Sequence, residues 1–184
     1  MVKYLKTPIT DEDVKSLKTG DVVYISGTMV TGRDEAHKRA VRENEEPGID
    51  LHGLVLYHAG PIVKDDKIIA CGPTTSKRME AYEADFIEKY GVKLIVGKGG
   101  MGDKTRESCI KNFCAHAIYP GGCAVIAADS MKRIKDEIWP DLGMPEGMWV
   151  LEVENFGPCI VNIDTHGGDM VAENVKVFKE RVGK

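Results

Sequence analysis

Three glycine-bounded segments place polar or cationic side chains directly after an apolar run and close to a predicted helix start. These segments are Gly27–His37 with Arg33, Gly72–Arg78 with Thr74 and Arg78, and Gly97–Met101 with Lys98. In α/β domains, ligands gather at the carboxyl ends of strands, where helix N-termini offer unpaired N–H groups. Arginine matches a carboxylate through two parallel hydrogen bonds, and lysine adds a point charge. The three cations together therefore predict a binding site for a small dianionic acid.

Each of these cations also has an interpretation without a ligand, because weak surface ion pairs are common. The possible acidic partners are Asp34 and Glu35 for Arg33, and Glu80 and Glu83 for Arg78. Lys98 lies between glycines and has no neighbouring side chains to cover, so a ligand role and a solvated role are equally open. The segment Gly97–Gly102 has neither the P-loop order nor the dinucleotide-binding spacing, and is therefore a weak indication of a phosphate site.

Two further residues could take part in proton transfer. His37 follows Asp34 by three positions, which puts both on one helical face, and an Asp–His pair beside arginines could orient a proton carrier. A surface histidine without a role is the equally open alternative. Thr74 lies in a turn whose hydroxyls suit helix capping. It could act as a base only as an alkoxide or relay held beside cations.

The histidines and cysteines do not indicate a metal centre on this chain. No two histidines have the spacing of metal ligands, so we assign no metal ligand, and His58 is predicted to be a core histidine. The five cysteines are odd in number and no export signal is evident, which disfavours disulfides. Cys109, Cys114 and Cys123 lack the close C-x2-C pair of most cluster and zinc loops, so buried packing is favoured.

The composition is that of a folded, mildly acidic protein. Apolar residues make up 42% and charged residues 29% of the 184 positions, and the formal net charge is −4. A basic nucleic-acid-binding surface is therefore not expected. The apolar runs are far shorter than the roughly 20 residues that span a bilayer, and MVKYLKTPIT carries no signal-peptide pattern. We expect no membrane segment and a cytoplasmic location.

Alternating helical and strand patterns along the chain predict a single layered α/β domain over residues 1–184, with a mixed central sheet. Helices are predicted at Thr10–Leu17, Asp34–Glu46, Lys77–Tyr90, Asp103–Ala115, Ser130–Ile138 and Met170–Val182. Strands are predicted at Val22–Ser26, Leu54–His58, Lys67–Cys71, Val92–Val96, Ala124–Ala128, Met148–Val153 and Cys159–Ile163. We expect Leu54–His58 to pair with Lys67–Cys71. We also expect Asp169 to cap the last helix, with a buried stripe of Val171, Val175, Phe178 and Val182.

The motifs ISGTMVTGRDEAHK, YHAGP, CGPTTSKRM and GKGGM, in this order, resemble the β subunit of class I fumarate hydratases. They equally resemble the β subunit of L(+)-tartrate dehydratase and the C-terminal domain of the single-chain enzymes. The resemblance runs from about Asp21 to Asp164 and includes the tail Asp164-x-x-Gly167. Four ordered motifs over most of the chain make the match specific, although the three cysteines at 109, 114 and 123 depart from the family pattern.

The resemblance implies an oxygen-sensitive hydro-lyase that hydrates fumarate to (S)-malate or dehydrates tartrate to oxaloacetate. It implies a swivelling β/β/α fold, and a [4Fe–4S] cluster held by cysteines of a separate α subunit, in an expected α2β2 assembly. The family's substrate-binding cations fall on Arg33, Arg78 and Lys98, its proposed catalytic threonine on Thr74, and an active-site histidine on His37. His37 could instead only orient Arg33 or Asp34. Asp34, Gly72, Gly99 and Gly100 would support the site.

Alternatives stay open at this stage. The motifs do not separate fumarate from tartrate as the substrate, and the residues that read the extra hydroxyl could belong to the α subunit. A non-catalytic dicarboxylate-binding module would use the same loops without needing a partner. A carrier domain phosphorylated on His37 gains no particular support from the neighbouring residues. Isolated chains could also self-associate through an apolar surface meant for the α subunit.

Overall fold

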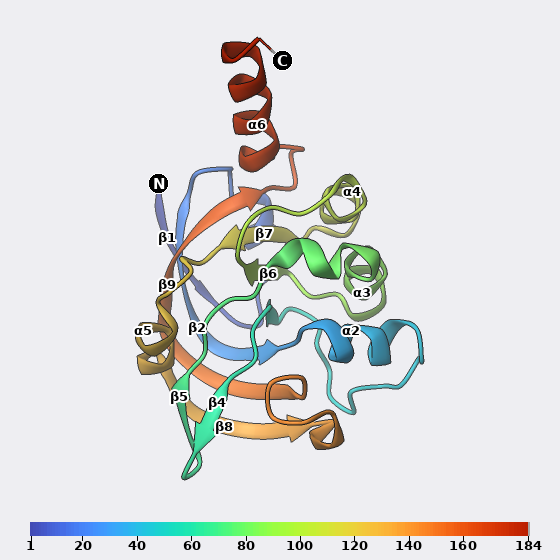
Figure 1. Ribbon diagram of the computed structural model, residues 1–184, viewed down its shortest axis with the longest axis vertical. Helices are drawn as coiled ribbons and strands as arrows, with labels where there is room; N and C mark the ends of the chain where they lie inside the picture. The colour runs from blue at the N-terminus through green and yellow to red at the C-terminus, as the bar shows by residue number, and fades with distance from the viewer. Residues whose placement is uncertain (184) are drawn as a thin grey trace.

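A mixed sheet forms the centre of the computed structural model, which describes residues 1–183 (Figure 1). In spatial order its strands are β1 (Val2–Lys6), β2 (Val22–Thr31), β3 (Val55–Tyr57), β6 (Leu94–Gly97), β7 (Ala115–Ile118), β9 (Met148–Ile163) and β8 (Met131–Ile138). The strands from β1 to β7 are parallel to their neighbours, whereas β9 runs antiparallel to β7 and β8. Because β2 also pairs with β9, the strands β2, β3, β6, β7 and β9 form a closed ring. The predicted α/β class with a mixed sheet is confirmed, while its finer assignment as a swivelling domain stays a prediction.

Two apolar cores lie on the two faces of this ring, because successive strand residues point to opposite faces. Val55 and Tyr57 of β3 belong to the inner core, whereas Leu56 between them belongs to the outer core. Helices α2 (Asp34–Val41), α3 (Glu83–Tyr90) and α4 (Asp103–Asn112) cover the outer face, on the right of Figure 1. Each fully buried large apolar side chain contributes about 1.5–3 kcal/mol. This packing fixes the ends of β2, β3 and β6 relative to α2 and α3.

The remaining elements lie around this framework. They are α1 (Asp11–Lys15), the hairpin β4 (Ile62–Lys64) and β5 (Lys67–Ala70), η1 (Ser76–Ala81), α5 (Ala124–Asp129), η2 (Pro140–Leu142) and α6 (Met170–Arg181). Helix α1 begins with a capping box at Thr10, and the N-cap at Asp169 is present as predicted. Among the described residues, every helix is too short or too polar to cross a membrane.

Helix α6 differs from the prediction in its packing. It projects away from the sheet at the top of Figure 1, and none of its residues is buried. The predicted buried stripe is therefore wrong, and Phe178 is 64% exposed. The apolar periodicity is present, but no described element lies against it beyond the contacts that the helix makes near its start.

Two neighbouring elements have the opposite structure to the predicted one. Ala124–Ala128 was predicted as a strand and forms helix α5, because alanine has the highest helix propensity and a short apolar run has no distinctive period. Ser130–Ile138 was predicted as a helix, but Met131–Ile138 forms β8, an edge strand paired with β9. Charged residues are common on edge strands, where they oppose aggregation, and this composition is also typical of a helix.

The strand pairing also differs in detail. Leu54–His58 and Lys67–Cys71 do not pair: β3 lies between β2 and β6, and β5 pairs with β4. Gly27 was predicted to end a strand, but β2 continues through it to Thr31 with a register shift beside it. Gly27 has a φ of 104° and packs directly against Thr7, so it marks a bulge. The two predicted strands after Met148 are one 16-residue strand, β9.

The predicted helices are mostly longer than the observed ones. Helix α2 ends at Val41, and the predicted helix Lys77–Tyr90 divides at Tyr82 into η1 and α3. Helix α4 ends at Asn112, because the next residue, Phe113, adopts a left-handed conformation and Ala115–Ile118 enters the sheet as β7. Strands β1, β4 and β7 were not predicted.

Candidate active site

The three glycine-bounded segments meet at the carboxyl ends of β2, β3 and β6, although the segment with Thr74 follows β5 of the separate hairpin. Strands β2, β3 and β6 are parallel neighbours, so their carboxyl ends lie together. The amide of Thr74 donates to the carbonyl of His58 at 2.7 Å, and the amide of Lys98 donates to the carbonyl of Thr74 at 3.0 Å. Ser76 in turn donates to the carbonyl of Lys98 at 3.0 Å. Backbone hydrogen bonds therefore hold the threonine segment along the ends of β3 and β6.

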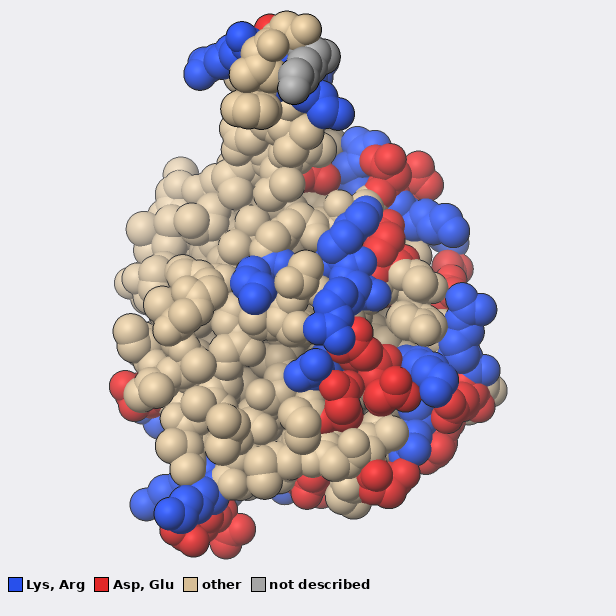
Figure 2. All heavy atoms as spheres, in the orientation of Figure 1, with Lys and Arg blue, Asp and Glu red and all other residues tan. Residues whose placement is uncertain are grey.

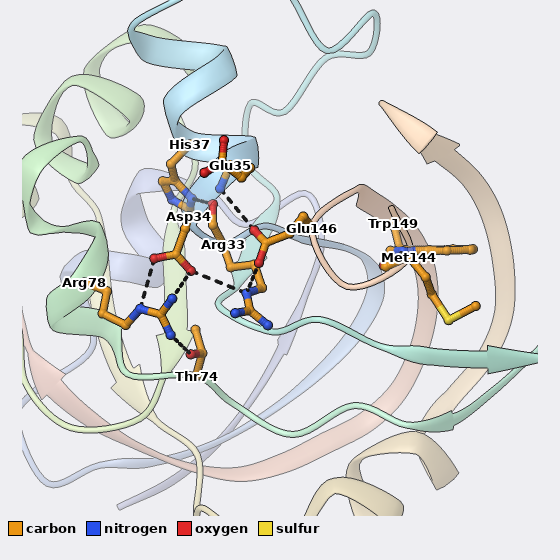
Figure 3. A network of polar contacts seen from close by, with 9 residues as sticks. All are labelled: Arg33, Asp34, Glu35, His37, Thr74, Arg78, Met144, Glu146 and Trp149. Carbon is orange, nitrogen blue, oxygen red and sulfur yellow. Dashed lines mark hydrogen bonds and ion pairs between the residues drawn. The ribbon is translucent and has the colours of Figure 1, made fainter. Parts of the chain in front are cut away.

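A bidentate ion pair joins α2 to η1 at this edge (Figure 3). Arg78 donates through Nε to Asp34 Oδ1 at 3.0 Å and through Nη2 to Asp34 Oδ2 at 2.6 Å. Its Nη1 lies 3.4 Å from Thr74 Oγ1. The suggested partners Glu80 and Glu83 are not the ones observed, because Glu80 turns to accept from the hydroxyl of Thr105 at 2.9 Å. Arg78 is thus held by Asp34 and points toward Thr74.

Arg33 forms the N-terminal boundary of α2 and has its own carboxylate partner. Its Nε lies 2.8 Å from Glu146 Oε1 and 3.4 Å from Asp34 Oδ2, which leaves its two Nη groups pointing away from these carboxylates (Figure 3). Glu146 Oε2 accepts from the amide of Glu35 at 3.1 Å, in the first turn of α2. Glu146 was not predicted as a partner of Arg33. It lies more than a hundred positions after Arg33, in a turn before β9, and no local pattern marks it.

Lys98 and the glycines form the third side of the site. Lys98 is exposed, and the following Gly99 has a φ of 75°, a conformation that favours glycine. A side chain at Gly100 would meet Val171 of α6 at 2.9 Å, and one at Gly72 would meet Ala124 of α5 at 3.0 Å. The predicted supporting glycines therefore allow either a left-handed turn or close packing beneath the loops.

His37 is buried beneath this surface and is not a surface residue. Its Nδ1 lies 2.8 Å from the carbonyl oxygen of Arg33, and its Nε2 lies 3.2 Å from Glu83 Oε2. His58 is also buried, as predicted, and its Nε2 lies 2.8 Å from the same Glu83 oxygen. The carboxylate partner of His37 is therefore Glu83 of α3, whereas Asp34 is occupied by Arg78. Glu83 was considered only as a partner of Arg78.

Burial and charge act on these groups in opposite directions. Burial lowers the pKa of His58, because an imidazolium loses its hydration. Burial alone would raise the pKa of Glu83, but the two imidazoles beside it hold that pKa well below its ordinary value. Glu83 is therefore ionised at neutral pH although its side chain is fully enclosed.

The cysteines do not form a cluster site within the described chain. Cys71 and Cys159 lie in the inner core, whereas Cys109 and Cys114 lie in the outer core. Burial raises the pKa of Cys71 to about 12, so its thiol stays protonated, and a protonated thiol is a poor metal ligand. Cys123 is half-buried next to α5, which was predicted as a strand. The cysteines thus do not fit a shared iron–sulfur cluster.

The site as a whole combines a cation-rich opening with a hydroxyl. Arg33 and Arg78 lie beside Thr74, and the backbone of Lys98 is hydrogen-bonded to it, so three cations belong to segments that meet here, which suits a small substrate with two carboxylates. The chain matches the sequence model of the family described as Fumarase C-terminus over residues 2–174, and so it belongs to that family. The resemblance drawn from the four motifs is therefore confirmed.

Similar proteins carry the names of two hydro-lyases. The L(+)-tartrate dehydratase subunit beta of Escherichia coli (strain K12) is 50% identical over 185 residues, which cover 98% of this chain and 92% of that protein. A Methanocaldococcus jannaschii protein named "Putative L(+)-tartrate dehydratase subunit beta" is 42% identical over 97% of this chain and 96% of its own length. A Geobacillus stearothermophilus protein named "Putative fumarate hydratase class I" is 36% identical over 98% of this chain, which corresponds to 35% of that longer protein.

Proposed function

We propose that this chain is the β subunit of an iron–sulfur-dependent hydro-lyase that acts on a four-carbon dicarboxylate. The observation that carries the proposal is the convergence of Arg33, Arg78 and Lys98 around Thr74 at the ends of β3 and β6. The names of the similar proteins give the same class of reaction. The cluster would be held by a separate α subunit, since the cysteines of this chain do not fit one.

The proposed roles follow from the geometry of each side chain. The free Nη groups of Arg33 would take one carboxylate as a fork, and Lys98 would neutralise the other. Arg78, fixed by Asp34, would stabilise the negative charge that develops when the proton leaves C3 of the substrate. Thr74 would accept that proton, because the neighbouring guanidinium stabilises its deprotonated form. The C3–H electron pair forms the double bond as the hydroxyl leaves C2. The leaving hydroxide takes a proton from solvent to become water, and the return of the Thr74 proton to solvent balances the elimination.

The substrate has two candidates. Hydration of fumarate to (S)-malate is the first of the two activities that the motifs imply. Dehydration of L(+)-tartrate to oxaloacetate is favoured by the names of relatives that are 42% and 50% identical and match this chain over nearly its whole length. (S)-Malate, the hydrated form of fumarate, and L(+)-tartrate both present two carboxylates and a proton on the carbon next to the leaving hydroxyl, so the same residues would serve either reaction.

Exposed apolar side chains supply surface for an α subunit. Val125 and Ile126 of α5 are 63% and 62% exposed, and Phe178 of α6 is 64% exposed. Figure 2 shows that the left and centre of this face carry few charged side chains, with basic residues crossing near its middle. Large exposed apolar areas are typical of interaction sites. We infer docking of the α subunit here, in an α2β2 assembly, and self-association of the chain when it is alone.

The test is an anaerobic reconstitution. This chain would be produced together with the cluster-bearing subunit encoded beside it, and kcat/KM would be measured for fumarate, (S)-malate and L(+)-tartrate. We expect turnover by the pair and none by this chain alone, with the preferred substrate given by the ratio of kcat/KM values. A pair that assembles and retains its cluster but turns over none of the three substrates would refute the proposal.

A further inference from the structure

Six polar side chains form a continuous buried row behind the site. They are His37, Glu83, His58, Ser76, His116 and Asn162, all with no exposed surface. They come from α2, α3, the end of β3, η1, β7 and β9, so the row crosses the whole outer core. Buried polar groups are costly unless each is paired, so each donor in the row must meet an acceptor.

The position of each proton in most of the row follows from one fixed end. The amide of Val171 donates to Asn162 Oδ1 at 3.0 Å, so Asn162 must present its NH2 group to His116 Nδ1, 3.3 Å away. His116 is therefore protonated on Nε2 and donates to Ser76 Oγ at 3.2 Å. The hydroxyl of Ser76 is then free to donate to His58 Nδ1 at 3.1 Å.

This order leaves the proton of His58 on Nε2, where it faces Glu83 Oε2 at 2.8 Å. Both His58 and His116 are thus neutral. Burial agrees with this result, since it lowers the pKa of His116 to about 3 and also lowers the pKa of His58. Neither of these two histidines can therefore supply the positive charge that balances Glu83.

The opposite end of the row identifies the missing charge. The carbonyl oxygen of Arg33 can only accept, so His37 Nδ1 carries a proton across their 2.8 Å contact. A neutral His37 would then turn a lone pair toward Glu83 Oε2 at 3.2 Å, which is repulsive. Within the described chain, the contacts of Glu83 with His58 and His37 are close but not aligned as hydrogen bonds, so a positive charge must balance this carboxylate. His37 is the group placed to supply it.

A metal ion explains the same three residues less well. The ligand atoms of His37, His58 and Glu83 lie within 4.8 Å of one another. Tetrahedral zinc with bonds of about 2.0–2.1 Å separates neighbouring ligand atoms by about 3.3 Å, however. The observed 2.8 Å between His58 Nε2 and Glu83 Oε2 is too short for that arrangement. The donor order derived above also places a proton, not a lone pair, on His58 Nε2.

We propose that Glu83 is a positioning residue: it keeps His37 as an imidazolium, and His37 in turn holds the Arg33 carbonyl and so fixes Arg33 and Asp34 toward the substrate. The proposal rests on the proposed hydro-lyase function. The remaining groups around His37 are Asp34 on its own helix, which Arg78 neutralises, His58 from the end of β3, and the ring of Phe86 at 5.0 Å. Among these groups, only Glu83 is both charged and otherwise uncompensated.

The kinetic test uses Glu83→Gln in the assembled enzyme. Without its counter-charge the buried imidazolium of His37 is uncompensated, so kcat/KM should fall and should depend more steeply on pH than in the wild type. Glu83→Asp keeps the charge and should retain the wild-type pH profile. Glu88→Gln is the matched control, because Glu88 lies on the same helix and pairs with Lys111 at the surface. A Glu83→Gln enzyme with the wild-type profile would overturn the inference.

A second readout does not depend on turnover. In the full chain with 15N-labelled histidine, both ring nitrogens of His37 should be protonated at pH 7.5, and His116 should carry its proton on Nε2. A neutral His37 would overturn the inference even if Glu83→Gln fails to fold. The inference would also fail if one equivalent of Zn2+ shifts the nitrogen signals of His37 and His58 together. If this protonation of His37 and His116 is found but the assembled enzyme turns over no four-carbon substrate, the proposed function fails instead.

Discussion

The ion pair between Asp34 and Arg78 should contribute little to folding stability but should position Arg78 beside Thr74. The variant Asp34→Asn tests both expectations. Both hydrogen bonds in the pair, at 3.0 and 2.6 Å, lose their charged acceptor, although the amide keeps the shape of the side chain. The two side chains are 28% and 49% exposed, so solvent screens the pair and its loss should cost no more than about 1 kcal/mol of folding free energy. For a chain of this size, that lowers the Tm by at most about 4 °C.

The same change should have a large effect on catalysis. Arg78 Nη1 lies 3.4 Å from Thr74 Oγ1 only because Asp34 holds the other side of the guanidinium. A misplacement of about 1 Å at a reacting group can cost about 100-fold in rate. The freed arginines would still attract a dianion, so the loss should be found in kcat and not in KM.

Steady-state kinetics of the reconstituted enzyme and thermal unfolding of the variant check the two halves of this prediction. Asp103→Asn is the control, since Asp103 is 86% exposed and its partner, Arg106 at 3.2 Å, lies one turn along the same helix. A kcat within threefold of wild type would show that the Asp34–Arg78 pair does not position the threonine. A Tm loss well above 4 °C would show instead that the pair is mainly structural.

Three further predictions concern stability and association. Phe156→Ala empties a fully buried position whose ring lies 4.8 Å from that of Tyr119, and should lower the free energy of unfolding in urea by about 3–5 kcal/mol. Phe178→Ser should change that free energy by less than about 0.5 kcal/mol, because Phe178 is exposed. The same variant should weaken association with the α subunit in sedimentation experiments, and unchanged association would exclude this helix from the interface. The unfolded state takes up a proton on His116 below about pH 6.5, whereas the folded state does so only near pH 3, so stability should fall by about 1.4 kcal/mol per pH unit in between. His116→Asn should remove this contribution in urea titrations at pH 5, 6 and 7, and an unaltered slope would contradict the buried neutral state.

The parts of the site that the sequence predicts are those that depend on local pattern. Arg33 and Lys98 each follow a parallel strand and a glycine, and the ends of parallel strands meet at one edge, so their convergence is foreseeable. Thr74 follows β5 of the separate hairpin, so its place beside β3 and β6 does not follow from this rule. Glu83 and Glu146 are not foreseeable in this way. Each is one acidic residue among 29 Asp and Glu, and its contact with His37 or Arg33 exists only through the folding of distant segments.

The errors in the fold have a similar origin. The run Ala124–Ala128 is apolar enough for a strand, yet it is short and rich in alanine, so tertiary context decides its structure. The charged segment Met131–Ile138 becomes a strand because β9 offers it an edge, a partner that local propensity does not reveal. Helix α6 shows the reverse case, since its apolar stripe is real but its partner does not lie within the described chain.

The closed ring of strands also sets an order of events on the ribosome. Strand β2 is complete at Thr31, but its partner β9 begins only at Met148, so the ring stays open until nearly the whole chain has been translated. At about 5–20 residues per second, the roughly 120 residues between them take on the order of 6–24 s to synthesise. Throughout that interval one edge of an apolar strand is unpaired, and such an edge readily joins another chain. The β1–β2 pair covers the opposite edge of β2, so the edge that faces β9 stays open to chaperones until β9 emerges.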